Sequence, residues 1–287
     1  MRELNTIVKS PEGKKEIFHH FAPALALSIA LENGLPIKRK IFDKIISEIK
    51  KVIKRGYVKW NENYPPDYDD TIIARKIFSL LLQPVKNKIK LSFSDNGGVF
   101  TYVGGLKSKT NNNVDILINL IILDYLIKTG EDNQSKEQLI SFLKKDKSSF
   151  KKSIEKLSKY YLSEGYLIYV LSNVSDVLDI DIGNLINHKI KKINNKTEIG
   201  FLILASSKPT KLLTEKYKKA ENGLIEMFQH SRLKLKFSCK FLDDVVRECA
   251  EIKIKKTLFD KDVANIYNKI RKQLYDYKKV LKVSYLY

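Results

Sequence analysis

Three aspartates stand within four positions of one short segment, NYPPDYDDTIIA at residues 63–74. A double proline stiffens the chain before them and an apolar run begins at Thr71, so Asp67, Asp69 and Asp70 are expected in the first turn of a helix. A single aspartate there would be explained as a helix cap. Three carboxylates repel one another, and one of them is driven to hold its proton. In apolar surroundings such a group remains a neutral carboxylic acid near pH 7 and becomes a proton donor.

The elements that must position this segment are predicted to be helices. In residues 36–54, isoleucines recur at helical spacing between Pro36, which suits a first helical position, and Gly56, which suits a stop. Ser135 and Gln138 have the spacing of a capping box, which predicts a helix that opens at Ser135. Further helical stretches are predicted at 11–33 with a break near Pro23, and at 71–82, 114–129, 148–162, 166–173, 176–191, 197–206, 209–221, 239–255 and 259–279.

The succession of helices also predicts the fold class. About a dozen helices joined by short linkers pack most simply as hairpins. We therefore predict an all-α fold, a single domain over residues 1–287 built as an (α/α)6-type toroid or barrel of paired helices, with 259–287 as a peripheral helix. A two-layer solenoid is the alternative. Two alternating segments, 88–93 and 232–237, fit either short strands or loop edges.

The charge of the chain is strongly positive, with 53 Lys and Arg against 33 Asp and Glu and a formal net charge of +20. Lys, Ile, Asn and Tyr are abundant together, which is typical of an AT-rich genome, and the lysines are spread over the polar sides of the predicted helices. We therefore expect solvated helix faces and no nucleic-acid partner. A positive surface still attracts diphosphates and anionic lipid, so peripheral association with a membrane is a further expectation.

Other composition features narrow the class of protein. The most apolar stretches, 21–31 and 114–127, are too short to span a bilayer, so a cytoplasmic protein is predicted. The two cysteines, Cys239 and Cys249, form no CxxC pair and the four histidines are scattered, so a zinc site of the usual spacing is excluded. Both thiols are predicted to be buried and reduced.

A set of motifs resembles a known family. DYDDT at 67–71 matches the DxDD(T) motif of class II terpene cyclases and squalene–hopene-type cyclases. GGVFTYV at 97–103 and VDILIN at 114–119 follow in the order seen in bacterial proteins of the terpenoid-cyclase/prenyltransferase-barrel superfamily. The segment KYYLSEGYLIYVLS at 159–172 is similar to a later aromatic helix of that group.

The resemblance implies a reaction and a set of residues. In such cyclases the middle aspartate of DxDD protonates an alkene or epoxide of a linear isoprenoid, which assigns the role of general acid to Asp69. Asp67 and Asp70 would tune this acid, and Thr71 could cap the turn. No cofactor is required, although Mg²⁺ is implied if the substrate is a diphosphate. Aromatic faces would stabilise the carbocation by cation–π attraction, and the candidates in or near the matching segments are Trp60, Phe78, Phe100, Tyr102, Tyr160 and Tyr161.

Each of these assignments has an alternative. The aromatic residues could equally be ordinary core. Asp115 and Asn119 lie four apart on one helix face and would either complete a polar patch beside the acid or serve as a helix cap and a satisfied buried amide. The segment DDVVRE at 243–248 only half resembles a class I DDxxD motif and is interpreted as an exposed helix face that carries an Asp243–Arg247 pair.

Two other functions also remain open at this stage. A glycoside hydrolase of the (α/α)6 type needs two carboxylates on either side of a glycosidic bond, and Asp69 with Asp115 could serve. A basic helical scaffold that binds protein or nucleic acid is the non-catalytic alternative, and it predicts acids that point to solvent.

Overall fold

The computed structural model describes residues 21–54, 56–58, 65–81, 87–103, 113–145, 147–230, 235–237 and 239–258. It is mostly helical, which confirms the predicted all-α class. The helices are α1 (Phe21–Glu32), α2 (Arg39–Val52), α3 (Tyr68–Leu80), α4 (Ile116–Thr129), α5 (Asn133–Lys145), α6 (Glu164–Leu178), α7 (Ile182–Lys189), α8 (Lys196–Ala205), α9 (Lys211–Lys219) and α10 (Lys240–Leu258).

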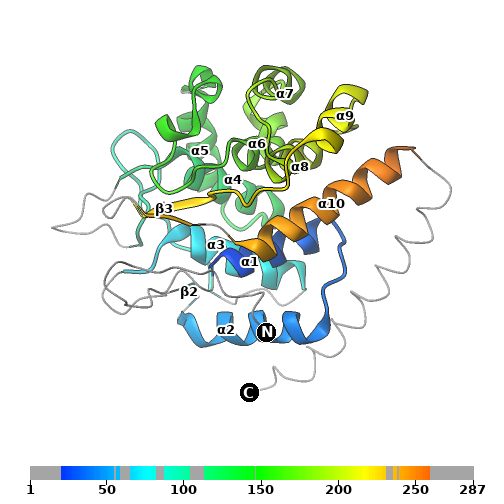
Figure 1. The fold of residues 1–287 in the computed structure, drawn as a ribbon. Coiled ribbons are helices and arrows are strands. Elements are labelled where there is room, and N and C mark those ends of the chain that lie inside the picture. The colour runs from blue at the N-terminus through cyan, green and yellow to red at the C-terminus, as the bar shows by residue number, and fades with distance from the viewer. Residues whose placement is uncertain are drawn as a thin grey trace.

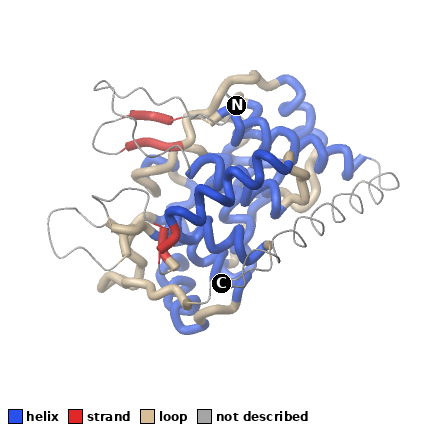
Figure 2. Tube along the Cα trace, turned by 90° about the horizontal axis from the view of Figure 1, so that it is seen from below, coloured by secondary structure: helices blue, strands red, loops and turns tan. Residues whose placement is uncertain are grey.

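Strands are few and short among these residues. The pairs are antiparallel: β1 (Ile53–Lys54) with β2 (Tyr57–Val58), and β3 (Phe228–His230) with β4 (Leu235–Phe237). Figure 2 shows that the helices make up the body of the molecule and that the strands lie at its edge. The segment 232–237 therefore contributes a strand, whereas 88–93 is irregular apart from the single bridge between Phe93 and Val99.

Contacts among the described helices close a cycle of six. Helix α1 packs against α3, α3 against α4, α4 against α6, α6 against α8, α8 against α10, and α10 returns to α1. The remaining helices pack on members of this cycle, with α2 on α1, α5 on α4, α7 on α6 and α9 on α8. In Figure 1, α4, α6 and α8 lie above α1 and α3, and α2 lies below.

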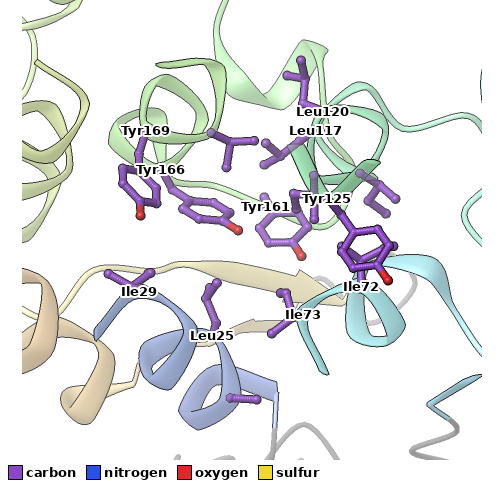
Figure 3. Packing of buried hydrophobic residues seen from close by; sticks show 14 of the residues in the cluster. Leu25, Ile29, Ile72, Ile73, Leu117, Leu120, Tyr125, Tyr161, Tyr166 and Tyr169 are labelled. Carbon is purple, nitrogen blue, oxygen red and sulfur yellow. The ribbon is translucent and has the colours of Figure 1, made fainter. Parts of the chain in front are cut away.

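The main hydrophobic core joins all six members of the cycle. A single cluster of buried residues runs from Ala22 of α1 to Cys249 of α10. Figure 3 shows Leu25 and Ile29 of α1 facing tyrosines from the opposite layer, where α4 and α6 lie. The six helices therefore share one core, and a second, smaller cluster of buried residues joins α6 to α10.

Several helix boundaries differ from the predictions for identifiable reasons. Helix α2 begins at Arg39 rather than at Pro36, and Gly56 lies in the β1–β2 turn with φ of 85°. Helix α1 runs without a break through Pro23, from Phe21 to Glu32. Helix α4 does end at Gly130, whose φ of 66° is the left-handed geometry of a helix stop.

The helix in the 135–145 region opens one turn earlier than predicted. Asp132 is the capping residue, because its carboxylate accepts hydrogen bonds from the Ser135 backbone N–H at 3.1 Å and from the Ser135 hydroxyl at 2.7 Å. The predicted cap at Ser135 is therefore wrong, and Ser135 is instead a donor to the cap. A carboxylate is the stronger acceptor at the positive end of a helix.

Three predicted helices between 148 and 191 are also corrected. The stretch 148–162 holds only 3₁₀ turns, at Lys147–Lys151 and Ile154–Lys156, and no α-helix. The stretches 166–173 and 176–191 are divided instead at Asp179, whose φ of 55° ends α6, and Asp181 then caps α7. The predicted helix at 259–279, the peripheral segment 259–287 and residues 11–20 lie outside the described residues.

The interpretation of 243–248 as an exposed face is wrong. Asp243 is fully buried, and neither of its carboxylate oxygens has a hydrogen-bond partner among the described residues. Arg247 bonds instead to the Thr197 hydroxyl at 2.9 Å and to the Gly223 carbonyl at 2.7 Å. Helix α10 turns this acid inward because it packs against both α8 and α1.

Two predictions on class can be compared directly with the structure. Within the described residues, no helix combines the length and apolar character needed to cross a membrane. Cys239 and Cys249 are both buried and form no disulfide with each other, as predicted. Burial raises the pKa of the Cys249 thiol to about 12, so it stays protonated at neutral pH.

Candidate active site

The separate motif segments of the sequence meet in space. Residues 66–68 run antiparallel to 101–103: the Tyr68 N–H donates to the Thr101 carbonyl at 3.0 Å, and the Val103 N–H donates to the Pro66 carbonyl at 2.8 Å. Phe100 in turn forms a bridge with Val114, directly before α4. The acid motif is thereby fixed against the two motif segments that follow it in the chain.

The start of α3 does not use its first acid as a cap. Asp67 occupies the N-cap position, yet its side chain forms no cap hydrogen bond. Its Oδ1 atom is buried without a hydrogen-bond partner in the described part of the chain. The Thr71 hydroxyl is buried as well and accepts from the Val58 N–H at 3.0 Å, so Thr71 anchors β2 rather than capping the turn. Helix capping therefore does not explain why the Asp67 carboxylate is there.

The three carboxyl groups are close enough to interact strongly. Asp67, Asp69 and Asp70 each place one oxygen within 4.8 Å of the others. Burial and the neighbouring carboxylates hold the pKa of Asp67 and of Asp70 well above the usual range, and protonated Asp70 donates a hydrogen bond to Asp67. The cluster thus divides into a proton-sharing pair, Asp67 with Asp70, and a separate acid, Asp69.

Asp69 has its own partner from a distant part of the chain. The Tyr161 hydroxyl donates to Asp69 Oδ2 at 2.8 Å, and Tyr161 is 0% exposed. Burial raises the pKa of Asp69 to about 6; the bond from Tyr161 opposes this rise, and the charge of Asp115 adds to it. Burial also raises the pKa of Tyr161 well above its usual value, so the phenol remains a donor.

Two further predicted tyrosines lie beside the acids. The hydroxyls of Tyr102 and Tyr160 form a hydrogen bond with each other. Burial raises the pKa of both, and the charges of Asp67 and Asp69 contribute. Residue 102 also forms a backbone bridge with Asp67. These rings therefore border the acid cluster, and their role in substrate binding stays a prediction.

Asp115 and Asn119 have structural partners. Asp115 caps α4: Oδ1 accepts from the Ile118 N–H at 3.1 Å, and Oδ2 accepts from the Ser158 hydroxyl and the Lys159 N–H, both at 2.8 Å. The Asn119 side chain bonds to the backbone N–H and carbonyl of Val99 at 2.7 and 2.9 Å. The structure thus shows Asp115 as a helix cap and Asn119 as a buried amide with its hydrogen bonds satisfied, which is the second of the two alternatives considered.

A row of aromatic rings leads away from Asp69. Tyr161 stacks on Tyr166 with ring centres 5.7 Å apart, and Tyr166 stacks on Tyr169 at 6.4 Å. Phe201 of α8 tilts against Tyr166 at 5.5 Å and against Tyr169 at 5.9 Å. Figure 3 shows the three tyrosine hydroxyls on the side that faces α1 and α3. This row carries electron-rich faces directly from the acid into the core.

The aromatic row contains rings that the sequence analysis does not name. Phe78 is buried in the main core and Phe100 is half-buried at its bridge to Val114, whereas Trp60 lies outside the described residues. Sequence reasoning missed Tyr166, Tyr169 and Phe201. The first two share the segment 159–172 with Tyr161 and could have been included, but nothing in the sequence points to Phe201.

The far end of the aromatic row meets a buried ionic network, which the sequence did not reveal. The Tyr169 hydroxyl bonds to Glu32 Oε2 at 3.0 Å. Lys76 Nζ lies 2.7 Å from Glu32 and 2.6 Å from Asp124, and Lys128 Nζ lies 2.5 and 2.8 Å from the same two acids. The charges of the two carboxylates and the two ammonium groups cancel. The network therefore links α1, α3, α4 and α6 without adding net charge to the interior.

The acid cluster is the one group of described residues whose geometry would suit a metal ion. Carboxylate oxygens are the ligands that Mg²⁺ prefers. No lysine or arginine forms an ion pair with Asp67, Asp69 or Asp70 in the part of the chain that the structure describes.

No protein family model matches the chain, and no curated protein matches it either.

Proposed function

We propose that the protein is a class II terpene cyclase-like enzyme, which starts the cyclisation of a linear isoprenoid by protonating it, with Asp69 as the general acid. The observation that carries the proposal is the state of the Asp69 carboxyl group. It is half-buried, bonded to a buried phenol at 2.8 Å, and has a pKa raised to about 6 by its surroundings. A catalytic acid works best with a pKa near the operating pH.

We further propose that the fold is the (α/α)6 toroid expected of this superfamily. The closed cycle of contacts through α1, α3, α4, α6, α8 and α10 supports an inner ring. The packing of α2, α5, α7 and α9 on members of that cycle supports a partial outer ring. In a solenoid, by contrast, helices at opposite ends have no reason to pack against each other, whereas α1 and α10, the first and last of the described helices, do.

The chemistry follows from the arrangement of the acids. Asp69 Oδ2 accepts a hydrogen bond from Tyr161, which leaves Oδ1 to carry the proton. Transfer of that proton to a terminal alkene or epoxide forms the new C–H or O–H bond and leaves a carbocation. The proton shared by Asp67 and Asp70 keeps a second full negative charge from forming beside Asp69. The carbocation then meets the stacked rings of Tyr161 and Tyr166, whose faces attract cations.

The glycoside hydrolase alternative needs Asp115 as its second catalytic carboxylate, and the hydrogen bonds of Asp115 argue against that role. Asp115 is 3% exposed, and both of its oxygens accept hydrogen bonds from the loop before Tyr160 and from α4. A general base needs a free oxygen that faces substrate. The scaffold alternative predicts acids that point to solvent, whereas Asp67 and Asp69 are half-buried and Asp70 is buried. Both observations favour the cyclase.

The proposal includes a class of substrate and a location in the cell. The substrate is an isoprenoid small molecule, as a prenyl diphosphate, a squalene-like hydrocarbon or a prenylated compound. The protonation step uses only side chains, and Mg²⁺ would enter as the counter-ion of a diphosphate head group. We propose a cytoplasmic protein that reaches lipid-soluble substrates by peripheral association with membranes, which its net charge of +20 would favour.

The test compares wild type with Asp69→Asn on farnesyl diphosphate, geranylgeranyl diphosphate, squalene and prenylated aromatics. We expect wild type to yield a cyclic product and Asp69→Asn to yield none, because an amide cannot donate a proton of comparable acidity. Asp95→Asn is the matched control, since Asp95 is an exposed aspartate outside the acid cluster. Equal product from wild type and Asp69→Asn would remove the assignment, as would the absence of cyclic product from wild type.

A further inference from the structure

Two neighbouring tyrosines in the loop before α6 both face the acid cluster. The Tyr161 hydroxyl donates to Asp69 at 2.8 Å, and Figure 3 shows this hydroxyl on the side of the ring that faces α1 and α3. Burial and the charge of Asp69 raise the pKa of Tyr160, whose hydroxyl bonds with that of Tyr102. In an extended chain, successive side chains point to opposite sides. The chain must therefore turn at this point to bring both hydroxyls to one site.

The Ser158 hydroxyl holds this turn. It accepts hydrogen bonds from the backbone N–H groups of Tyr160 and Tyr161, both at 3.2 Å. The chain bends at residues 159 and 160. A serine oxygen that accepts from N–H groups two and three positions further along is a common way to stabilise a turn. One oxygen atom thus orients the backbone of both tyrosines.

The Ser158 hydroxyl is held in turn by a buried carboxylate. It donates its proton to Asp115 Oδ2 at 2.8 Å, and Ser158 and Asp115 are each 3% exposed. A serine hydroxyl can donate one hydrogen bond and accept two. The bonds to Asp115, Tyr160 and Tyr161 therefore use its full capacity, and its orientation is fixed.

Asp115 connects this loop to the start of α4. Its Oδ1 atom accepts from the Ile118 N–H at 3.1 Å, which is the helix cap. Its Oδ2 atom accepts from the Ser158 hydroxyl and from the Lys159 N–H, both at 2.8 Å. One carboxylate oxygen thus serves the helix and the other serves the loop that carries the two tyrosines.

We propose that Ser158 is a positioning residue for the protonation step: its hydroxyl, held by Asp115, turns the chain so that the Tyr161 hydroxyl stays on Asp69. This inference rests on the proposed function. The bond from Tyr161 occupies Asp69 Oδ2 and so determines that Oδ1 presents the proton. Ser158 exchanges no proton with the substrate and acts through Tyr161.

The experiment measures kcat and KM of Ser158→Ala on the prenyl substrate that wild type converts. The measurement is made at pH 5, below the pKa of about 6 of Asp69, so that the acid is protonated. We expect kcat to fall by about ten-fold, because a misplaced catalytic group slows the reaction. KM should stay as in wild type, because Ser158 does not act on the substrate itself.

Ser163→Ala is the matched control in the same segment. Ser163 is 0% exposed, and its hydroxyl accepts from the Tyr166 N–H at 3.0 Å as the cap of α6. Each variant removes a buried hydroxyl that accepts from the backbone, so both should lower the melting temperature. Only Ser158→Ala should lower kcat, and an equal fall in Ser163→Ala would overturn the inference.

Two further variants test the hydroxyl and the route of its effect. Ser158→Cys fills the space with a thiol that bonds only weakly, and it should lower kcat as Ser158→Ala does. In a Tyr161→Phe background, Ser158→Ala should change kcat by less than about two-fold, because the bond that Ser158 supports is already absent. Losses that multiply in the double variant would overturn the inference.

A measurement without turnover separates the inference from the function on which it rests. The proton that Tyr161 donates to Asp69 should give a downfield NMR resonance that disappears in Tyr161→Phe. We expect Ser163→Ala to retain this resonance and Ser158→Ala to lose it or shift it upfield. If Ser158→Ala keeps both the resonance and the wild-type kcat, the role of Ser158 is refuted and the cyclase assignment stands. If Asp69→Asn is as active as wild type, the cyclase assignment fails, and the catalytic role of Ser158 fails with it.

Discussion

The Tyr161 hydroxyl donates a hydrogen bond to Asp69 Oδ2 over 2.8 Å, although 92 positions separate the two residues in the chain. Asp69 lies in the first turn of α3, and Tyr161 precedes α6. The backbone N–H groups of Tyr160 and Tyr161 both donate to the Ser158 hydroxyl, which itself donates to Asp115 at 2.8 Å. The partner of the candidate acid is therefore held in place by the cap of α4.

The first prediction concerns the pH profile of turnover. Asp69 must be protonated to act, so activity falls as the pH rises through its pKa of about 6. The hydrogen bond from Tyr161 stabilises the ionised form and lowers this pKa. Tyr161→Phe should therefore move the alkaline limb of the profile to higher pH, by about one to two units. Tyr169→Phe should leave the limb in place, and a limb that moves to lower pH in Tyr161→Phe would contradict this role.

The second prediction concerns stability against pH. Burial raises the pKa of Glu198 to about 7, from 4.5, and that of Asp243 to about 6, from 3.8. In each case the folded state binds more protons than the unfolded state between the two values. The free energy of unfolding should therefore fall as the pH rises from 5 to 7.5, by about 1–2 kcal/mol for each group.

Urea denaturation at the two pH values measures this change. Acids with a lowered pKa, such as Glu32 and Asp132, are ionised in both states above pH 5 and contribute little to the slope. Asp243→Asn removes one of the titrating groups and should make the dependence shallower. Stability that is flat or increases from pH 5 to 7.5 would show that these acids are not in the environment described.

The third prediction concerns Arg75, which is 1% exposed. Its guanidinium group bonds to the Tyr125 hydroxyl at 3.1 Å, to the carbonyls of Gly56 and Asn87, and to Glu131 at 3.2 Å. Arg75→Met leaves these acceptors without a donor and should lower the free energy of unfolding by about 3–5 kcal/mol.

Two variants test whether this effect depends on the geometry of the guanidinium group. Arg75→Lys should rescue little, because an ammonium group cannot reach several acceptors in one plane. Lys51→Met removes an exposed ion pair with Glu48 and should cost less than about 1 kcal/mol. A similar loss for Arg75→Met and Lys51→Met in urea denaturation would refute the prediction.

The fourth prediction concerns the close contact of α6 with α8. A Cβ atom on Gly165 would lie 2.4 Å from the Glu198 carbonyl oxygen and 2.7 Å from its Oε2 atom. The Gly165 N–H also donates to that carboxylate at 2.6 Å. Gly165→Ala must therefore push the two helices apart, and a loss of about 1–3 kcal/mol is expected.

The same substitution in α7 provides the control. Among the atoms that the structure describes, a Cβ on Gly183 would come within 4 Å only of Asp181 Oδ1, at 3.3 Å. Gly183→Ala should therefore be neutral or stabilising by up to about 1 kcal/mol, because alanine favours helix. Melting temperatures that fall equally in the two variants would show that the close approach of α6 to α8 is not the cause of the destabilisation by Gly165→Ala.

Local features of the fold could be predicted from residues near one another in the chain. The isoleucine spacing within 36–54 marks α2, and Gly130 marks the end of α4. The capping residue of α5 could not be predicted, because Asp and Ser are both common helix caps. The hydrogen bonds in the folded protein show that Asp132 is the cap. Burial was misjudged where a charged residue faces a partner helix, as with Asp243.

The sequence alone determined that the chain is helical and that three acids gather at the start of one helix, because helical periodicity and helix starts depend on residues within a few positions of one another. Only the tertiary structure decided that Asp69 bonds to Tyr161, that Tyr166 stacks one ring beyond, and that α10 returns to α1. These relationships join segments far apart in the chain, and they depend on how the helices pack around the shared core. The pKa of Asp69 depends on them too, because burial and neighbouring charges exist only once the chain has folded.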